Sequence, residues 1–173
     1  MARTLSRGLA PVVERLELDR PEIVTLRDIE GICNEEGIGT EPRVVASRLK
    51  KAGWLLPTGQ RGAWEFAPAE LAARIEDAKP TVIVAASCGI EPSRVVEYKP
   101  MLDAALDRSS HKPESVIVLQ REQAFASVGE RDTDWEEIDW DELVTDAEPV
   151  GCVEVEATDP LYVLYTSGTT GRP

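Results

Sequence analysis

The chain has 173 residues, of which 42% are hydrophobic and 29% are charged. This length suits one ordinary domain or two small ones, and the composition is that of a folded protein, not of a disordered segment. No apolar run approaches the ~20 residues that a membrane-spanning helix needs, and the first residues lack the apolar stretch of a secretion signal. We therefore expect a cytoplasmic protein.

Acidic residues are unevenly distributed along the chain. Residues 1–78 hold 11 lysines and arginines against 13 aspartates and glutamates, whereas residues 79–173 hold 8 against 19. The net charge of −13 argues against nucleic-acid binding by the whole chain. The asymmetry predicts two unlike parts, which we place at residues 1–68 and 69–173.

Three cysteines and one histidine stand far apart, without the spacing of a zinc site or a disulfide framework. These residues are Cys33, Cys88, Cys152 and His111. Each cysteine has apolar neighbours, so we expect three buried, reduced thiols and a loop position for the histidine, with no metal site.

Two helices are predicted at the start of the first part. The first carries apolar residues at helical spacing from Leu5 to Leu16 and breaks at residues 19–21. The second begins at Thr25, with Asp28 placed for a capping box. A third helix, opened by Thr40 as its N-cap, follows.

The third helix buries Val45, Leu49 and Ala52 and ends at Gly53. After it the apolar period changes to two, because residues 54–56 and 63–66 are short strand-like runs around a turn. Three helices followed by a hairpin is the order of a winged helix-turn-helix, in which the third helix would read DNA and the hairpin would be the wing.

Basic and polar residues occupy the outer face of the third helix and the tip of the hairpin, which suits contact with duplex DNA. An ordinary solvated helix face explains them equally well on charge alone. The candidate DNA-binding residues are Arg43, Ser47, Lys50, Lys51 and Arg61.

Residues 49–55 and 59–68 resemble the N-terminal winged-helix domain of AbiE-type antitoxins, over most of residues 5–68. The resemblance implies promoter binding for autorepression. It covers a small domain without catalytic residues.

The second part predicts a parallel α/β arrangement. A helix is expected at residues 70–78, a strand buried on both faces at residues 81–87 and a loop at residues 88–92. A second helix at residues 100–108 and a second buried strand at residues 115–119 follow. Strand, helix, strand at this spacing is a βαβ unit. The expected fold class is α/β overall.

An acidic stretch with two tryptophans, Trp135 and Trp140, covers residues 122–142. It predicts a solvated loop that runs into an amphipathic helix capped by Asp139, with an interaction motif as the alternative. Its carboxylates have no basic partners nearby, so we predict no catalytic residue. The last strands are expected at residues 151–156 and 161–165.

The glycine-rich residues after the last strand can turn sharply and direct several N–H groups and hydroxyls at one anion. A plain surface turn is the common alternative for such composition. The candidate phosphate-binding residues are Thr166, Ser167, Gly168, Thr169, Thr170 and Gly171.

The string Tyr-Thr-Ser-Gly-Thr-Thr-Gly-Arg-Pro at residues 165–173 resembles the signature loop of the AMP-forming acyl-CoA synthetases. Residues 73–80, 85–92 and 98–103 resemble the acetyl and propionyl type of that family. The resemblance implies ATP with Mg²⁺ at the loop, and a short-chain carboxylate and CoA as partners of a complete enzyme. The lysine that follows the loop in that family is absent from this chain, which ends at Pro173, so we expect a fragment without synthetase activity of its own.

The two resemblances meet at residues 66–71, a short string that suits both families. Three interpretations stay open. The chain is a fragment or a chimera of a ligase, a DNA-binding regulator that acts through its first part, or a regulatory fusion that senses a nucleotide.

Overall fold

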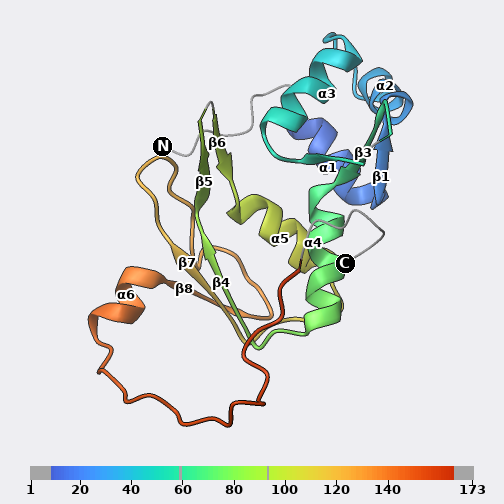
Figure 1. Cartoon of the computed structure of the whole chain (residues 1–173). Coiled ribbons are helices and arrows are strands. Elements are labelled where there is room, and N and C mark those ends of the chain that lie inside the picture. The colour runs from blue at the N-terminus through green and yellow to red at the C-terminus, as the bar shows by residue number, and fades with distance from the viewer. Residues whose placement is uncertain (1–8, 59, 93, 166–173) are drawn as a thin grey trace.

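The computed structural model describes residues 9–58, 60–92 and 94–165 (Figure 1). Its first part has three helices and three short strands. These are α1 (Ala10–Asp19), β1 (Ile23–Thr25), α2 (Leu26–Glu35), α3 (Pro42–Lys51), β2 (Leu55–Pro57) and β3 (Ala63–Phe66). The strands form one antiparallel sheet in the order β1-β3-β2, so the predicted hairpin is present and gains a third strand.

Local signals explain where α2 and α3 begin and end. The Thr25 hydroxyl accepts a hydrogen bond from the Asp28 N–H, and the Asp28 carboxylate accepts one from the Thr25 N–H at 2.7 Å, which completes the predicted capping box. After α3, Gly53 has a φ of +89°, a conformation that favours glycine. The predicted cap at Thr40 is wrong, because α3 starts at Pro42 with Glu41 as its N-cap and without a side-chain cap bond.

Aromatic rings form the centre of the first part. Trp54 and Phe66 stack with their ring centroids 6.0 Å apart, and Phe66 is fully buried. The Arg108 guanidinium also lies over the Phe66 ring, 5.4 Å from its centroid. Burying one such side chain contributes on the order of 2 kcal/mol.

The second part has three helices and five strands. They are α4 (Ala67–Ala78), β4 (Val82–Ala86), β5 (Cys88–Glu91), β6 (Arg94–Glu97), α5 (Lys99–Arg108), β7 (Ser115–Leu119), β8 (Glu136–Asp139) and α6 (Trp140–Thr145). Strands β4, β7 and β8 form a parallel sheet in that order, so the predicted βαβ unit is confirmed.

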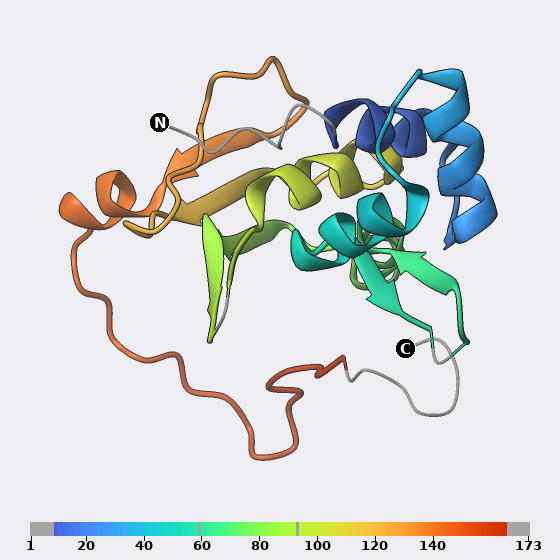
Figure 2. The same cartoon turned by 90° about the horizontal axis from the view of Figure 1, so that it is seen from above.

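Helices α4 and α5 cover one face of the parallel sheet, where Val116 and Val118 are fully buried (Figure 2). Two predictions for this part are wrong. Strand β4 lies at the edge of the sheet, and its Val82 and Val84 are 45% and 58% exposed on the face that the helices leave open. Residues 88–92, predicted as a loop, include the first strand of the β5-β6 hairpin.

The acidic stretch also contains strand β8, which was not predicted. Its backbone hydrogen bonds come only from pairing with β7, which lies some twenty residues earlier in the chain. The predicted helix cap is confirmed, since the Asp139 carboxylate accepts a hydrogen bond from the Asp141 N–H at 2.9 Å. Trp135 is buried and Trp140 is 37% exposed.

The two parts share a core. Val96, Met101 and Ala104 of the second part belong to the same buried cluster as α1, α2 and α3. Arg94 donates a hydrogen bond to the Lys50 carbonyl at the end of α3 at 2.5 Å. The division of the chain at residue 68 therefore crosses a packed interface.

The segment from residue 147 to 165 has neither helix nor strand. The strands predicted at residues 151–156 and 161–165 are wrong for this reason, and Leu161, Tyr162, Val163 and Leu164 are 75–83% exposed. Cys33 and Cys88 are buried as expected, whereas Cys152 is exposed in this segment. Within the described part of the chain, no helix is both long and apolar enough to cross a membrane.

Candidate functional site

The predicted phosphate-binding residues, Thr166 to Gly171, lie outside the described residues. The structure describes the chain up to Tyr165, the residue before them. Tyr165 lies against α4, where its hydroxyl donates a hydrogen bond to the Asp77 carboxylate. This hydrogen bond raises the pKa of the Tyr165 hydroxyl.

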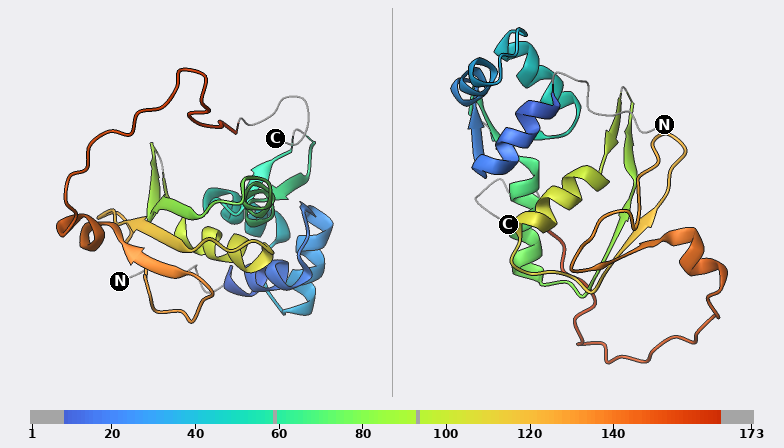
Figure 3. Two further views of the ribbon diagram at one scale, coloured as in Figure 1. Left: turned by 90° about the horizontal axis from the view of Figure 1, so that it is seen from below. Right: turned by 180° about the vertical axis from the view of Figure 1, so that it is seen from behind.

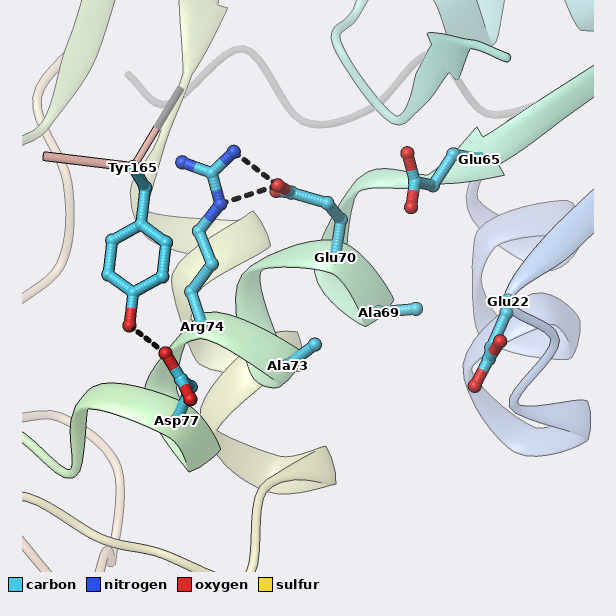
Figure 4. Close-up of a pocket in the computed structure, with 8 residues that line it drawn as sticks. All are labelled: Glu22, Glu65, Ala69, Glu70, Ala73, Arg74, Asp77 and Tyr165. Atoms are coloured by element: carbon cyan, nitrogen blue, oxygen red, sulfur yellow. Dashed lines mark hydrogen bonds and ion pairs between the residues drawn. The ribbon is translucent and has the colours of Figure 1, made fainter. Parts of the chain in front are cut away.

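A cavity of about 260 Å³ opens beside Tyr165, between α4 and the strands of the first part (Figure 4). The Arg74 guanidinium is 5.6 Å from the centroid of the Tyr165 ring and also pairs with the Glu70 carboxylate. The lining residues are Glu22, Glu65, Ala69, Glu70, Ala73, Arg74, Asp77 and Tyr165. Four carboxylates and one guanidinium do not favour a phosphate inside this cavity, so phosphate contact would depend on the loop itself.

A buried ion-pair network lines a second cavity of about 220 Å³, near the end of β4. The Lys99 ammonium is 2.6 Å from an Asp103 oxygen and 2.7 Å from a Glu137 oxygen, and the side chains of Lys99 and Glu137 are 5% and 2% exposed. Glu137 also accepts hydrogen bonds from the Gly129 N–H and the Trp135 indole.

Burial alone would raise the pKa of Glu137, but hydrogen bonds from Lys99 and the Gly129 N–H hold it below its usual value. The pKa of Asp103 is raised by burial, which the nearby Lys99 only partly offsets. Only the four-residue spacing of Lys99 and Asp103 on a helix signals this network in the sequence. Arg131 is a second cation of the network, 3.4 Å from an Asp103 oxygen. Each carboxylate therefore has a cationic partner, and the network is a structural feature that joins α5 to β8.

Glu76 on α4 holds the turn after α5. Its carboxylate accepts hydrogen bonds from both the N–H and the hydroxyl of Ser110, from the Ser109 hydroxyl at 2.8 Å and from the His111 N–H at 3.1 Å. These bonds lower the pKa of Glu76 to about 2. The ring of His111 lies in the loop as predicted, 2.8 Å from the Pro80 carbonyl.

The candidate DNA-binding residues are all exposed. Arg43, Ser47, Lys50 and Lys51 lie on the side of α3 opposite Val45 and Leu49, and Arg61 lies at the turn between β2 and β3. The Lys50 ammonium is 5.2 Å from the Trp64 ring of β3, so the helix and the hairpin contact each other through it. Arg48 is also exposed on α3.

Comparisons with known proteins support the predicted resemblance of the second part of the chain to the acyl-CoA synthetases. Human acyl-CoA synthetase short-chain family member 3, mitochondrial, is 46% identical over 110 residues, which cover 62% of this chain and 15% of the relative. The propionate–CoA ligase of Escherichia coli is 38% identical over 109 residues, 62% of this chain and 17% of the relative.

A third relative, an uncharacterised protein of Pseudomonas aeruginosa, is 40% identical over 168 residues, 90% of this chain and 26% of the relative. This match extends across residues 66–71 and so gives no support to a join between two unrelated proteins. The chain spans about a quarter or less of the length of these relatives.

The family model described as AMP-binding enzyme matches residues 63–173. This range covers more than half of the chain and includes the glycine-rich residues after Tyr165. The chain therefore belongs to the AMP-binding enzyme family.

Proposed function

We propose that this chain supplies the phosphate-binding part of an AMP-forming acyl-CoA ligase. The observation that carries the proposal is the family match over residues 63–173, which runs through the glycine-rich residues 166–171. The relatives named as short-chain acyl-CoA synthetase and propionate–CoA ligase support a short-chain carboxylate such as propionate as the acyl substrate, with acetate as the alternative.

In this proposal the N–H groups and hydroxyls of Thr166 to Gly171 hold the phosphates of ATP, which enters as a substrate with Mg²⁺. Such donors stabilise the charge that develops as the carboxylate attacks the α-phosphorus atom and pyrophosphate leaves. The CoA thiol then attacks the acyl carbonyl of the acyl-adenylate, which forms the thioester and releases AMP. Tyr165, the last described residue before the loop, is held on α4 by its hydrogen bond to Asp77.

The test is a graft in which residues 63–173 replace the matching segment of the E. coli propionate–CoA ligase. We expect the graft to catalyse propionate-dependent exchange of pyrophosphate into ATP, while the 173-residue chain alone shows none. Thr169→Ala in the graft should lower exchange at least about tenfold by removing a phosphate donor. Thr158→Ala, the same change at an exposed position outside the loop, should leave it within about twofold.

A folded graft that binds ATP by calorimetry but exchanges no pyrophosphate would limit the role to nucleotide binding. A folded graft without ATP binding would contradict the proposal.

The first part favours a second candidate function, binding to duplex DNA as in a winged helix-turn-helix. Its support is the element order α1-β1-α2-α3-β2-β3, the sheet order β1-β3-β2 and the exposed basic residues of α3 and the hairpin turn.

Fluorescence anisotropy with labelled genomic duplexes at low salt tests this second function on the whole chain. We expect binding that weakens steeply with salt, and replacement of Arg43, Lys50, Lys51 and Arg61 by alanine should flatten the salt dependence. Arg27→Ala removes an exposed arginine of α2 and is the control. Binding that survives the four replacements unchanged would rule out this face.

A further inference from the structure

We propose that residues 1–8 of this chain bind in a groove between α1 and α5 and thereby hold the first part of the chain to the second. Arg3 and Arg7 would pair with carboxylates at the rim of the groove, and Leu5 would pack on its apolar floor. Residues 1–8 lie outside the described residues, whereas the groove lies within them. This occupant follows from shape, charge and length, and it does not depend on the proposed ligase function.

The groove has a volume of about 340 Å³ and is formed by one stripe of each helix. Figure 3 shows α1 and α5 side by side in both of its views. Trp54 and Arg131 complete the lining. The stripes have the spacing of one helix face, with Ala10, Val13, Glu14 and Glu17 on α1 and Pro100, Asp103, Ala104 and Asp107 on α5. Because α1 belongs to the first part and α5 to the second, an occupant of the groove contacts both parts.

The floor of the groove is apolar. Val13, Trp54 and Ala104 line it, and only 3%, 4% and 7% of their surfaces reach solvent. Leu5 stands between the two arginines of the segment, so it can lie on this floor while they point to the rim. The transfer of an apolar side chain from water to such a floor favours docking.

The rim of the groove is acidic and has too few cations. The Arg131 guanidinium already pairs with Asp107 at 2.8 Å and with Asp103 at 3.4 Å. Among the described residues, Glu14 and Glu17 take part in no ion pair. Burial, together with the nearby carboxylates of Asp107 and Glu14, raises the pKa of Glu17, and the neighbouring guanidinium groups only partly offset this effect. A further guanidinium at this rim would form charge-assisted hydrogen bonds with both glutamates.

The segment before α1 has the complementary composition. Residues 1–8 read Met-Ala-Arg-Thr-Leu-Ser-Arg-Gly, with two arginines and no acidic residue. Helix α1 begins at Ala10 and has Pro11 in its first turn, a favoured place for a residue without an N–H to bond to the preceding turn. A helix is therefore not expected to continue from the segment into α1. Gly8 suits a reversal of the chain at this point, because glycine adopts backbone conformations that other residues avoid.

The segment is also long enough to reach the carboxylates. Glu14 and Glu17 lie about 6 and 11 Å beyond Ala10 along the axis of α1, at 1.5 Å per residue. An extended chain spans about 3.4 Å per residue, so Arg7 can reach about 10 Å from Ala10 and Arg3 about 24 Å. A chain that turns back along α1 therefore places Arg7 near Glu14 and Arg3 near Glu17.

The titration of Glu17 in the whole chain tests the proposal, followed by carbon NMR of its side-chain carboxyl group. Arg3→Gln with Arg7→Gln should raise the measured pKa of Glu17 further, because the carboxylate loses nearby cations. Arg27→Gln with Arg61→Gln is the matched control. It removes the same charge at two exposed arginines that do not line the groove, and it should leave the pKa of Glu17 unchanged.

Limited proteolysis gives a second measurement on the whole chain. Trypsin cleaves the Arg7–Gly8 bond when the segment is out of the groove, so the cleavage rate follows the population of the undocked state. Glu14→Gln with Glu17→Gln should speed this cleavage about threefold or more, because two ion pairs of modest strength are lost. Cleavage after Arg61, at the hairpin turn outside the groove, is the internal reference and should not change.

Glu30→Gln with Glu36→Gln makes the same change at two exposed glutamates outside the groove and should not speed cleavage. An unchanged pKa of Glu17 in the arginine variant, or equal cleavage with and without the two groove glutamates, would overturn the proposal. A cleavage rate that falls as the protein concentration rises would place the segment of a second copy in the groove, which would equally overturn docking within one chain.

Discussion

The antiparallel sheet β1-β3-β2 and the parallel sheet β4-β7-β8 have three strands each but differ in what covers them. The first sheet closes on α1, α2 and α3, and its Val24 and Phe66 are fully buried. The second has helices on one face only, and its edge strand leaves Val82 and Val84 exposed. The comparison shows that the first sheet is covered by helices close to it in the sequence, with Val96, Met101 and Ala104 of the second part completing its core, whereas the second sheet keeps one face open.

The largest loss of stability is expected from Phe66→Ala, which removes the ring that connects the core of the first part to Arg108 of the second part. We expect a loss of about 3–5 kcal/mol in the free energy of unfolding, because the cavity cannot close between Trp54 and the guanidinium. Urea unfolding measures it. Leu18→Ala, at a position 75% exposed, is the control and should cost less than about 0.5 kcal/mol.

Replacing Lys99 by methionine tests how much the ion-pair network stabilises the second part. We expect a loss of about 3 kcal/mol, because the buried Glu137 would lose its only ion-pair partner among the described residues, while Asp103 keeps Arg131. The double variant Lys99→Met with Glu137→Gln should recover part of this loss in the same urea experiment. A single variant as stable as the wild type would show that this network does not hold α5 to β8.

Loss of the cap of α2 is expected to have a moderate effect. Thr25→Ala removes the acceptor for the Asp28 N–H and should cost about 1 kcal/mol in thermal or urea unfolding. Thr158→Ala, an exposed threonine in the extended segment, is the matched control. Equal stability of the two variants would mean that tertiary packing alone sets the start of α2.

The smallest effect is expected for Glu76→Gln, and it depends on pH. The folded pKa of about 2 lies below the ordinary value of 4.5, so the carboxylate contributes stability above that ordinary value and loses it as the pH falls toward 2. The unfolding midpoint of the wild type should therefore exceed that of the variant at pH 6 and approach it near pH 2.5. A difference that stays constant over this range would contradict the assignment.

Much of the first part could be predicted because its signals are local. The Thr25 capping box, the glycine after α3 and the change of apolar period at Trp54 each depend on residues a few positions apart. The third strand, β1, escaped prediction because it is three residues long and pairs with β3 across some forty residues of chain.

The residues of the candidate sites were likewise found where they lie close together in the sequence and missed where they lie far apart. The basic residues of α3 were found because helical spacing places them opposite the apolar stripe. The ion pair of Lys99 with Glu137 was missed because 38 positions separate the two residues. The phosphate-binding assignment of residues 166–171 stays a prediction, which the family match over residues 63–173 supports.

The sequence by itself determined the helices, the caps at Thr25 and Asp139, the hairpin and the parallel βαβ unit, because backbone capping and apolar periodicity act over short distances. Only the tertiary structure decided that β4 is an edge strand, that Val96 and Met101 complete the core of the first part, and that residues 161–165 lie exposed. A strand forms only when a partner satisfies its N–H and C=O groups, and the sequence of one segment does not say whether that partner is in place.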